Sequence, residues 1–330
     1  MDLGPLTVTL KFDDKRLESL AQVSLENSRI VLTQPILFLC GGQVDITSFE
    51  PLSVRGALVE YLHSAKCHLA ESITLAEDFK DWIHDSVYRD LLAFESDIAH
   101  ISSLIIIILE SAGALAELGL FVKNRALRNK ILVFVSQEHY EESSFVRLGP
   151  LRYLQGIKES SVCAYPWDQK DLRRSLSTSL KEMREDILNA VSGQDGSEAF
   201  NKENEGHVSF VVYEIIKTFR ALKLLEIEAY LEALGLSVSR DKLKRLIFLL
   251  GKFKLIGSSK RGHVDYYYAL IDAVKVEFAG KFDQTRAKIA AQQFYATNDG
   301  ESKRMHVIQS AYAVATPTPT PAVLAVGAEK

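Results

Sequence analysis

Features that define several protein classes are scarce in this sequence of 330 residues. Its three cysteines, Cys40, Cys67 and Cys163, are odd in number and far apart, so they predict neither a disulfide framework nor a metal site. The eight histidines show no HxxxH or HExxH spacing, so we expect no metal. The longest apolar run, at residues 104–109, is far below the roughly 20 residues of a membrane-spanning helix. No basic start precedes an apolar core, so we expect no signal peptide and a cytoplasmic location.

What the sequence does contain is typical of an ordinary folded protein. It is 47% hydrophobic and 25% charged, which excludes disorder of the whole chain and a collagen-like composition. At about 150 residues per domain, its length predicts two domains.

The first half of the chain alternates between patterns of buried strands and helices. An apolar run at 35–40 ends in Gly41-Gly42, and the run at 104–109 is rich in branched residues, which favours burial on both faces. Further strands are expected at 131–135 and 161–165, with helices at 112–126 and 172–191. After an N-terminal extension, 1–29, we therefore expect an α/β domain over 30–191, with a Rossmann-like or flavodoxin-like parallel sheet.

The second half reads mainly as helices. A polar, glycine-containing segment, 192–207, is predicted to be a linker. Helical patterns at 210–225, 226–234 and 240–252 precede a strand–turn–strand pattern around Gly262, which is the order of a winged helix-turn-helix. We assign that domain to 208–275 and a C-terminal helix to 276–312. The tail, 313–330, has alternating prolines and is predicted to be disordered.

Charge is distributed unevenly along the chain. The net charge is −4, but residues 235–262 carry eight basic residues and one acid, so this segment is +7 and the remainder −11. Such a basic helix and hairpin favour contact with nucleic-acid phosphates, although the solvated face of a protein-docking domain has the same composition. The predicted nucleic-acid-binding residues are Arg240, Lys242, Lys244, Arg245, Lys260 and Arg261.

Two acids lie where ligands bind in open parallel sheets, beyond the carboxyl ends of strands. Glu110 ends the 104–109 strand, and Glu117 lies in the first turns of the next helix, whose dipole favours an ionised carboxylate. Neither GxGxxG nor GxxxxGK[ST] is present, so an ordinary dinucleotide fold or an NTPase is disfavoured. Glu117 is a candidate nucleophile toward a sugar carbon, and a role as a surface acid remains the alternative.

Three short motifs resemble segments of a known protein family. They are Phe38-Leu39-Cys40-Gly41-Gly42, Glu117-Leu118-Gly119-Leu120-Phe121 and Gly149-Pro150-Leu151-Arg152. The region that contains them resembles the nucleoside 2-deoxyribosyltransferase-like family. Together with the C-terminal pattern it is similar to effector proteins of bacterial retrons, over about residues 30–275. One departure is Ser111-Ala112-Gly113, where the deoxyribosyltransferases have Asp-x-Gly, and it speaks against simple nucleoside base exchange.

The resemblance implies that Glu117 is the catalytic nucleophile of an N-glycosidase, which hydrolyses NAD to nicotinamide and ADP-ribose as a toxin in antiphage defence. NAD is then the substrate, and no cofactor is implied. The implied partners are the retron reverse transcriptase and its msDNA or non-coding RNA, with a homo-oligomer or filament of the complex and no membrane. Two alternatives stay open: a nucleoside 2-deoxyribosyltransferase and a ligand-sensing winged-helix transcription factor. The predicted substrate-binding residues are Cys40, Gly41, Gly42, Asp97, Glu110, Ser111, Gly113 and Asn124, with Arg55 a further candidate.

Overall fold

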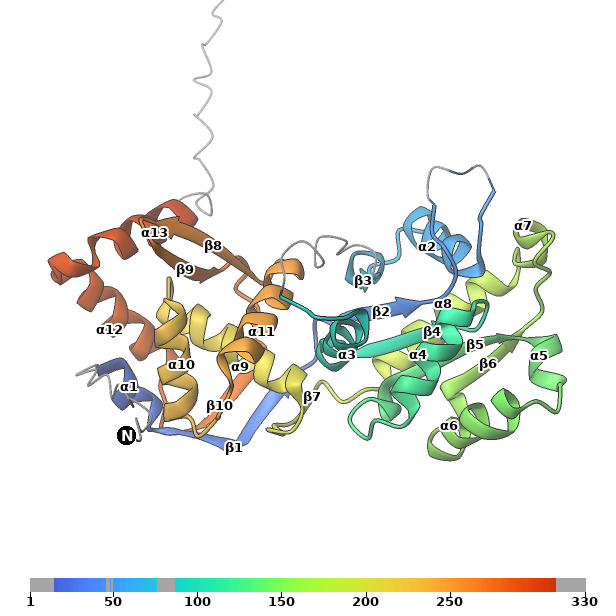
Figure 1. Ribbon diagram of the computed structural model, residues 1–330, viewed down its shortest axis with the longest axis horizontal. Coiled ribbons are helices and arrows are strands. Elements are labelled where there is room, and N and C mark those ends of the chain that lie inside the picture. The colour runs from blue at the N-terminus through green and yellow to red at the C-terminus, as the bar shows by residue number, and fades with distance from the viewer. Residues whose placement is uncertain (1–14, 46–47, 49, 76–86, 313–330) are drawn as a thin grey trace, which may run out of the picture.

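The computed structural model describes residues 15–45, 48, 50–75 and 87–312, which form two lobes side by side (Figure 1). The N-terminal tail to residue 14 and the C-terminal tail 313–330, where disorder was expected, lie outside the described residues. Within the described residues, no helix has both the length and the apolar character to cross a membrane.

The first lobe is built on a five-stranded parallel sheet, which confirms the expected α/β class. Its strands lie in the order β3 (Ile73–Thr74), β2 (Leu37–Cys40), β4 (Leu104–Ile108), β5 (Ile131–Ser136) and β6 (Val162–Tyr165). This is the flavodoxin-like order, in which the chain reverses its direction of winding between β2 and β4. Ligands bind in such sheets at the carboxyl ends of the two strands that flank the reversal.

Helices cover both faces of this sheet because its strands are apolar on both faces. In β4, Ile105 and Ile107 pack in one core cluster, and Leu104, Ile106 and Ile108 pack in the other. The first cluster includes residues of α3 (Leu91–Ile101), α4 (Ala112–Val122) and α6 (Arg152–Ile157); the second includes residues of α2 (Val54–Ser64), α7 (Leu172–Ser175) and α8 (Ser179–Ser192). Helix α4 ends four residues earlier than expected, where the Asn124 side chain accepts a hydrogen bond from the backbone of Ala126.

Shorter elements complete the first lobe. They are η1 (Ala70–Ser72), η3 (Arg128–Lys130), α5 (Gln137–Glu141), the π-helical turn η4 (Arg147–Leu151) and η5 (Glu159–Ser161).

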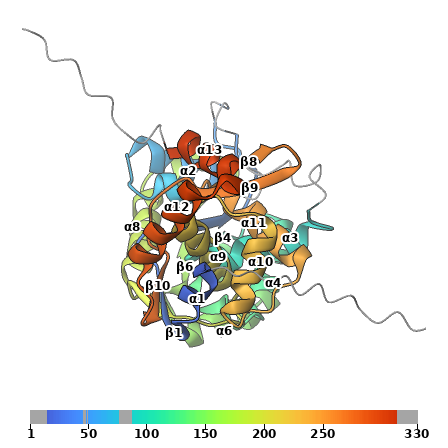
Figure 2. The same ribbon diagram turned by 90° about the vertical axis from the view of Figure 1, so that its left-hand side faces the viewer.

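The second lobe surrounds helix α9 (Glu205–Phe219), which is buried along nearly its whole length. The helices α10 (Leu224–Ala233) and α11 (Arg240–Lys252) and the hairpin β8 (Ile256–Arg261) and β9 (Val264–Ala269) follow in the order of a winged helix-turn-helix. Residues 276–312, expected as one helix, instead form β10 (Val276–Gly280), α12 (Gln284–Thr297), the turn η6 (Asp299–Glu301) and α13 (Ser302–Tyr312). In the end-on view, α1, α10 and α12 lie around α9 (Figure 2).

The expected extension and linker both contribute to the second lobe. Strand β1 (Val23–Val31) pairs with β10 on one side and with β7 (Ser197–Ala199) on the other, in a three-stranded antiparallel sheet. Helix α1 (Lys15–Leu20) packs against α10 and α12. The chain therefore enters the second lobe first, crosses to the α/β lobe and returns.

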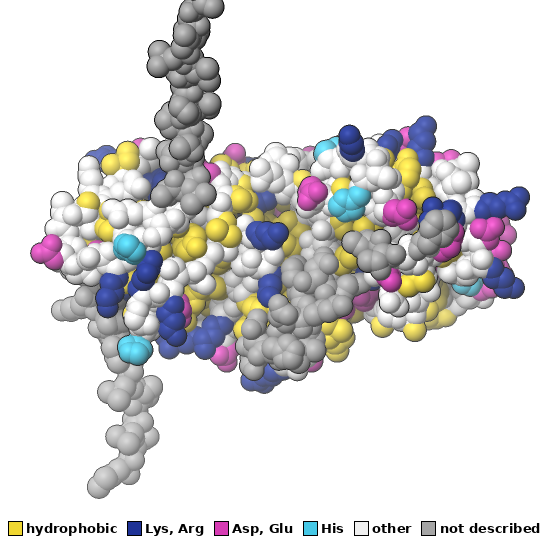
Figure 3. Space-filling model, turned by 90° about the horizontal axis from the view of Figure 1, so that it is seen from above, with side chains coloured by type: hydrophobic (Ala, Val, Ile, Leu, Met, Phe, Trp, Pro, Cys, Tyr) yellow, Lys and Arg dark blue, Asp and Glu magenta, His cyan; other side chains and the backbone are white. Residues whose placement is uncertain are grey.

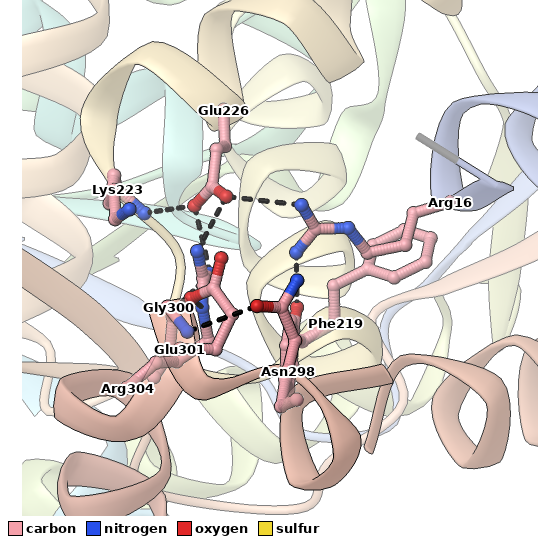
Figure 4. A network of polar contacts seen from close by, with 10 residues as sticks. Arg16, Phe219, Lys223, Glu226, Asn298, Gly300, Glu301 and Arg304 are labelled. Atoms are coloured by element: carbon pink, nitrogen blue, oxygen red, sulfur yellow. Dashed lines mark hydrogen bonds and ion pairs between the residues drawn. The ribbon is translucent and has the colours of Figure 1, made fainter. Parts of the chain in front are cut away.

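A buried ionic network holds this lobe together (Figure 4). The guanidinium of Arg304, which is fully buried, donates to both oxygens of Glu226 at 2.6 and 2.8 Å, and Arg16 donates to the same carboxylate at 3.1 Å. Burial raises the pKa of Glu226, but the hydrogen bonds and charge of Arg304 outweigh it and hold the pKa below its usual value. One carboxylate thus ties α1, α10 and α13 together.

The substitution Glu226→Gln is expected to reduce the free energy of unfolding by about 3–5 kcal/mol, because it removes the buried carboxylate charge that Arg16 and Arg304 share. Urea denaturation monitored by circular dichroism measures this loss. Glu228→Gln is the control: Glu228 lies on the same helix as Glu226 but pairs with the exposed Arg240 of α11, so this variant should show little change. Equal losses in the two variants would contradict the role given to the buried network.

Candidate active site and interdomain seam

Glu110 connects the two strands that flank the reversal. Its Oε1 accepts hydrogen bonds from the backbone N–H of Gly42 and of Arg55, both at 2.9 Å, and its Oε2 accepts one from Val54 at 2.6 Å. Val54 and Arg55 begin α2, so the carboxylate satisfies amides at a helix N-terminus, where a negative charge is favoured. Glu110 was predicted to bind substrate, and in the structure its carboxylate is bound by the backbone amides of the protein itself.

The Gly41-Gly42 pair is required by packing around this carboxylate. A Cβ on Gly42 would lie 2.6 Å from the Ser53 Cβ, and one on Gly41 would lie 3.0 Å from the Arg55 Cβ. Arg55 is itself buried, and its Nε donates to the Gly42 carbonyl at 2.5 Å. The glycines therefore permit the close approach of β2, α2 and Glu110, whereas the sequence suggested an approach to a ligand.

Glu117 lies at the same edge, against the end of β2. The thiol of Cys40 hydrogen-bonds to the Glu117 carboxylate, and Glu95 of α3 also acts electrostatically on that thiol. Burial raises the pKa of the Cys40 thiol well above its usual value, and the charges of Glu117 and Glu95 raise it further. Because a neutral, buried thiol is a poor nucleophile, Cys40 is unsuited to nucleophilic attack.

Glu95 was not among the residues expected from the sequence. It is only 8% exposed and lies on α3 beside the fully buried Phe94. Its signal was its position beside Phe94 and three residues before Ile98, on the buried face of the helix, because buried carboxylates are rare unless they are partnered or functional. The structure brings Glu95, Glu117 and Cys40 together from α3, α4 and β2.

Ser111 and Gly113 lie in the turn that begins α4. The Ser111 hydroxyl accepts a hydrogen bond from the Ala114 N–H at 3.1 Å and donates to the Gly41 carbonyl at 3.3 Å, which links α4 to β2. Gly113 is exposed, and a Cβ there would meet nothing closer than 3.8 Å. Ser111 therefore positions the helix that carries Glu117.

A cleft of about 790 Å³ opens beside the start of α4, at the carboxyl ends of β4, β5 and β6. Ser111, Ala112 and Leu115 line it, whereas Glu117 lies two residues beyond Leu115 and so points to the opposite flank of the helix. Glu117 thus lies beside this cleft without lining it. Among the described residues, no group of three or more His, Cys, Asp or Glu side chains could hold a metal ion.

Asp97 and Asn124 lie elsewhere in the lobe. Asp97 accepts a hydrogen bond from the Tyr88 hydroxyl at 2.9 Å and pairs with Arg245 of α11 at 3.2 Å. Asn124 donates from Nδ2 to the Nε2 of His100 at 3.2 Å, in addition to its contact with Ala126. The contacts of Asp97 thus belong to the boundary between the lobes, and those of Asn124 to the turn that ends α4.

That boundary is a packed seam, defined here as the contact of α11 with α3 and with the start of α9. Phe248 stacks edge-on against Tyr88 and Phe94, with ring centroids at 5.8 and 6.5 Å, and Leu249 is fully buried in the core cluster of the α/β lobe. Lys242 pairs with Glu205 at 2.7 Å, and Arg245 with Asp97. These residues recur at helical spacing along one face of α11, which therefore faces the α/β lobe.

Three of the predicted nucleic-acid-binding residues are consequently engaged within the chain. Lys242 and Arg245 lie in the seam, and Arg240 pairs with Glu228 at 2.6 Å. Lys244 and Lys260 are exposed, and Arg261 is half-buried at the tip of the hairpin. A Cβ on Gly262 at that tip would lie 3.6 Å from the Lys303 Nζ of α13, so the hairpin and α13 form one basic surface.

Comparisons with known proteins bear on this arrangement. A family model described as "STM3845 retron effector protein" matches residues 51–258, more than half of the chain. The chain is 30% identical over 131 residues to the Escherichia coli "Retron Ec73 putative ribosyltransferase/DNA-binding protein", covering 38% of this chain and 39% of that protein. It is 31% identical over 147 residues to the corresponding Ec86 protein of Escherichia coli, covering 44% and 43%. The similarity thus spans less than half the length of each relative.

The seam contains a carboxyl group whose titration can be measured. Burial raises the pKa of Asp97 to about 6, and a hydrogen bond with Glu205 adds to this effect. The unfolded chain releases this proton near pH 4, so between about pH 4 and 6 the folded state binds more protons than the unfolded state. Its contribution to stability is therefore full below about pH 4 and falls as the pH rises to 6.

We expect the free energy of unfolding of the wild type, relative to Asp97→Asn, to fall by about 2 kcal/mol between pH 4 and 7. Urea denaturation of both proteins at several pH values checks this. Asp241→Asn, which removes an exposed carboxylate of α11, is the control and should run parallel to the wild type. A constant difference between the wild type and Asp97→Asn would refute the raised pKa.

Proposed function

Because the chain belongs to the STM3845 retron effector family, we propose that its α/β lobe cleaves the N-glycosidic bond of NAD with Glu117 as nucleophile. The two relatives carry "ribosyltransferase" in their names, which supports transfer of a ribosyl group. The observation that carries the proposal is the difference between the surroundings of two acids, Glu110 and Glu117. Glu110 is bound by three backbone amides, whereas Glu117 lies half-buried beside Cys40 and Glu95 at the carboxyl edge.

In the first step, a carboxylate oxygen of Glu117 forms a bond to the anomeric carbon of the nicotinamide ribose. The bond from that carbon to the ring nitrogen breaks, and its electron pair stays on the nitrogen. Because this nitrogen is cationic in NAD, nicotinamide leaves as a neutral base without being protonated. The transition state resembles an oxocarbenium ion, which the nearby carboxylates stabilise electrostatically.

In the second step, water attacks the anomeric carbon and the ester bond to Glu117 breaks, which releases ADP-ribose and restores the carboxylate. A second carboxylate that accepts the proton of this water assists the step in retaining glycosidases. Glu95 supplies that carboxylate in our proposal, because it acts on the same thiol as Glu117 from the neighbouring helix.

Positioning of Glu117 follows from the contacts already described. The Cys40 thiol donates to its carboxylate, and Ser111 links the start of α4 to the Gly41 carbonyl. Glu110 fixes that same glycine loop to α2 through its bond with Gly42. We therefore expect the nucleophile to be held in one orientation before substrate binds, which reduces the entropic cost of reaction.

Glu117→Gln keeps the shape of the side chain but removes its charge and nucleophilicity, so NAD cleavage should fall at least 10³-fold, on the order of the loss of a catalytic nucleophile. Chromatography of nicotinamide and ADP-ribose after incubation of the full chain with its retron complex measures the activity. Glu60→Gln, the same change at an exposed position of α2, is the control and should retain it. Undiminished cleavage by Glu117→Gln would refute the assignment, and base exchange without ADP-ribose would favour a deoxyribosyltransferase.

For the second lobe we propose nucleic-acid binding through the hairpin and α13, with the retron DNA–RNA product and its reverse transcriptase as partners. Both relatives are named as DNA-binding proteins, which supports the class of ligand. In the view from above, Lys and Arg side chains lie on the surface of this lobe, as they do at the far end of the α/β lobe (Figure 3). Since one face of α11 is packed in the seam, the contact surface we propose consists of Lys244, Lys260, Arg261, His263 and Lys303.

The double variant Lys260→Glu/Lys303→Glu should weaken binding of the retron DNA–RNA product and lower the salt dependence of the binding constant by roughly two phosphate contacts. Fluorescence anisotropy at several salt concentrations checks both quantities. Lys181→Glu on the α/β lobe changes a comparable exposed charge and serves as the control. Equal affinities and equal salt slopes for all three proteins would rule out this surface.

A further inference from the structure

The cleft beside α4 does not include Glu117, at which we propose that the ribose reacts. We propose that this cleft is a subsite for a nucleoside moiety remote from the cleaved bond, so that the substrate is a dinucleotide and not a free nucleoside. The inference rests on the proposed function and extends it to the class of substrate. Its volume of about 790 Å³ lies within the range of small-molecule sites.

The walls of the cleft suit an uncharged aromatic ring. Leu109, Leu115, Val135 and Val146 provide apolar surface from four successive segments of the α/β lobe. Trp167, in the loop after β6, packs partly on the core cluster of the lobe and partly lines the cleft. An indole held in this way is a rigid surface on which a nucleobase can stack.

The polar groups of the cleft suit a sugar better than a phosphate. Four acids line it, Glu110, Glu138, Glu142 and Asp168, against the two basic side chains His139 and Lys170. Carboxylates repel phosphates but accept hydrogen bonds from ribose hydroxyls, as an acid does in dinucleotide-binding folds. We therefore place a base and its ribose in the cleft and the phosphates outside it.

The distance to the nucleophile favours a dinucleotide. The cleft reaches Ala112, the first residue of α4, and Glu117 lies five residues further along the same helix, a rise of about 7.5 Å. Since Glu117 also points to the other flank of the helix, a single nucleoside that fills the cleft cannot present its anomeric carbon to Glu117. Two nucleosides joined by phosphates can fill the cleft and reach Glu117 at the same time.

The test is a binding measurement, so that it does not depend on turnover. Isothermal titration calorimetry of the full chain carrying Glu117→Gln would measure the affinities of ADP-ribose, adenosine and nicotinamide mononucleotide. Adding Trp167→Ala should weaken the binding of ADP-ribose and of adenosine at least about tenfold, as expected for a lost stacking contact. The affinity for nicotinamide mononucleotide should change less than twofold. Trp167→Phe, which retains a ring, should restore most of the affinity.

Phe145→Ala is the matched control, because this aromatic ring is 86% exposed and lies beside the cleft without lining it. The subsite is refuted if the affinity for ADP-ribose of the protein with Trp167→Ala lies within twofold of that of Glu117→Gln alone. It is also refuted if the affinities for all three ligands fall equally, or if adenosine does not bind at all. Failure of the proposed reaction looks different: adenosine binding would still depend on Trp167, while the chain with intact Glu117 would leave NAD uncleaved.

Discussion

The arrangement of the carboxyl edge depends on one carboxylate bound by three backbone amides. Glu110 leaves β4 and accepts hydrogen bonds from Gly42 after β2 and from the first two residues of α2. These contacts join the two strands at which the chain reverses its winding. A Cβ on Gly42 would collide with Ser53 at 2.6 Å, and one on Gly41 would be crowded by Arg55 at 3.0 Å. Cys40 is thereby brought to Glu117. The structural acid and the proposed nucleophile are thus separate residues, seven positions apart in the chain.

Helix α3 connects this edge to the second lobe. Two positions apart on the same helix, Glu95 acts on the Cys40 thiol and Asp97 pairs with Arg245 of α11. Because successive positions on a helix differ by about 100°, these two acids point to different neighbours. The winged-helix lobe is therefore packed against an element that also contributes to the proposed active site. The helix that would enter a DNA groove in a simple winged helix contributes its apolar and basic face to this packing.

Local sequence patterns predicted many of the helices and strands but few of the contacts between segments that are distant in the sequence. The apolar runs at 35–40 and 104–109 and the spacing of Leu243, Leu246, Ile247 and Leu250 gave the parallel sheet and α11, because burial imposes those patterns locally. The pairing of β1 with β10 could not be predicted, since it joins segments about 250 residues apart and neither has a strong pattern of its own. Strand β7 lies in the segment that was expected to be a linker, and it was missed because it too has no strong pattern of its own.

The candidate site was predictable only in its residue types. Glu110 and Glu117 look alike in the sequence, and only the backbone amides around Glu110 distinguish it from Glu117, the nucleophile that we propose. Asp97 was predicted from the sequence and Glu95 was not considered, because nothing in the sequence shows which face of α3 meets β2. Arg245 and Lys242 appeared as nucleic-acid contacts, since their partners Asp97 and Glu205 lie in distant segments.

The central claim, that Glu117 forms a bond to the sugar, is tested most directly by trapping the ester. A 2′-fluoro-arabino analogue of NAD slows the breakdown of such an intermediate, and peptide mass spectrometry then locates the modified residue. We predict a fluorinated ADP-ribosyl adduct on the peptide that contains Glu117, absent from Glu117→Gln. An adduct on Glu110, Glu95 or Cys40 instead, or analogue turnover with no adduct on any peptide, would contradict the account.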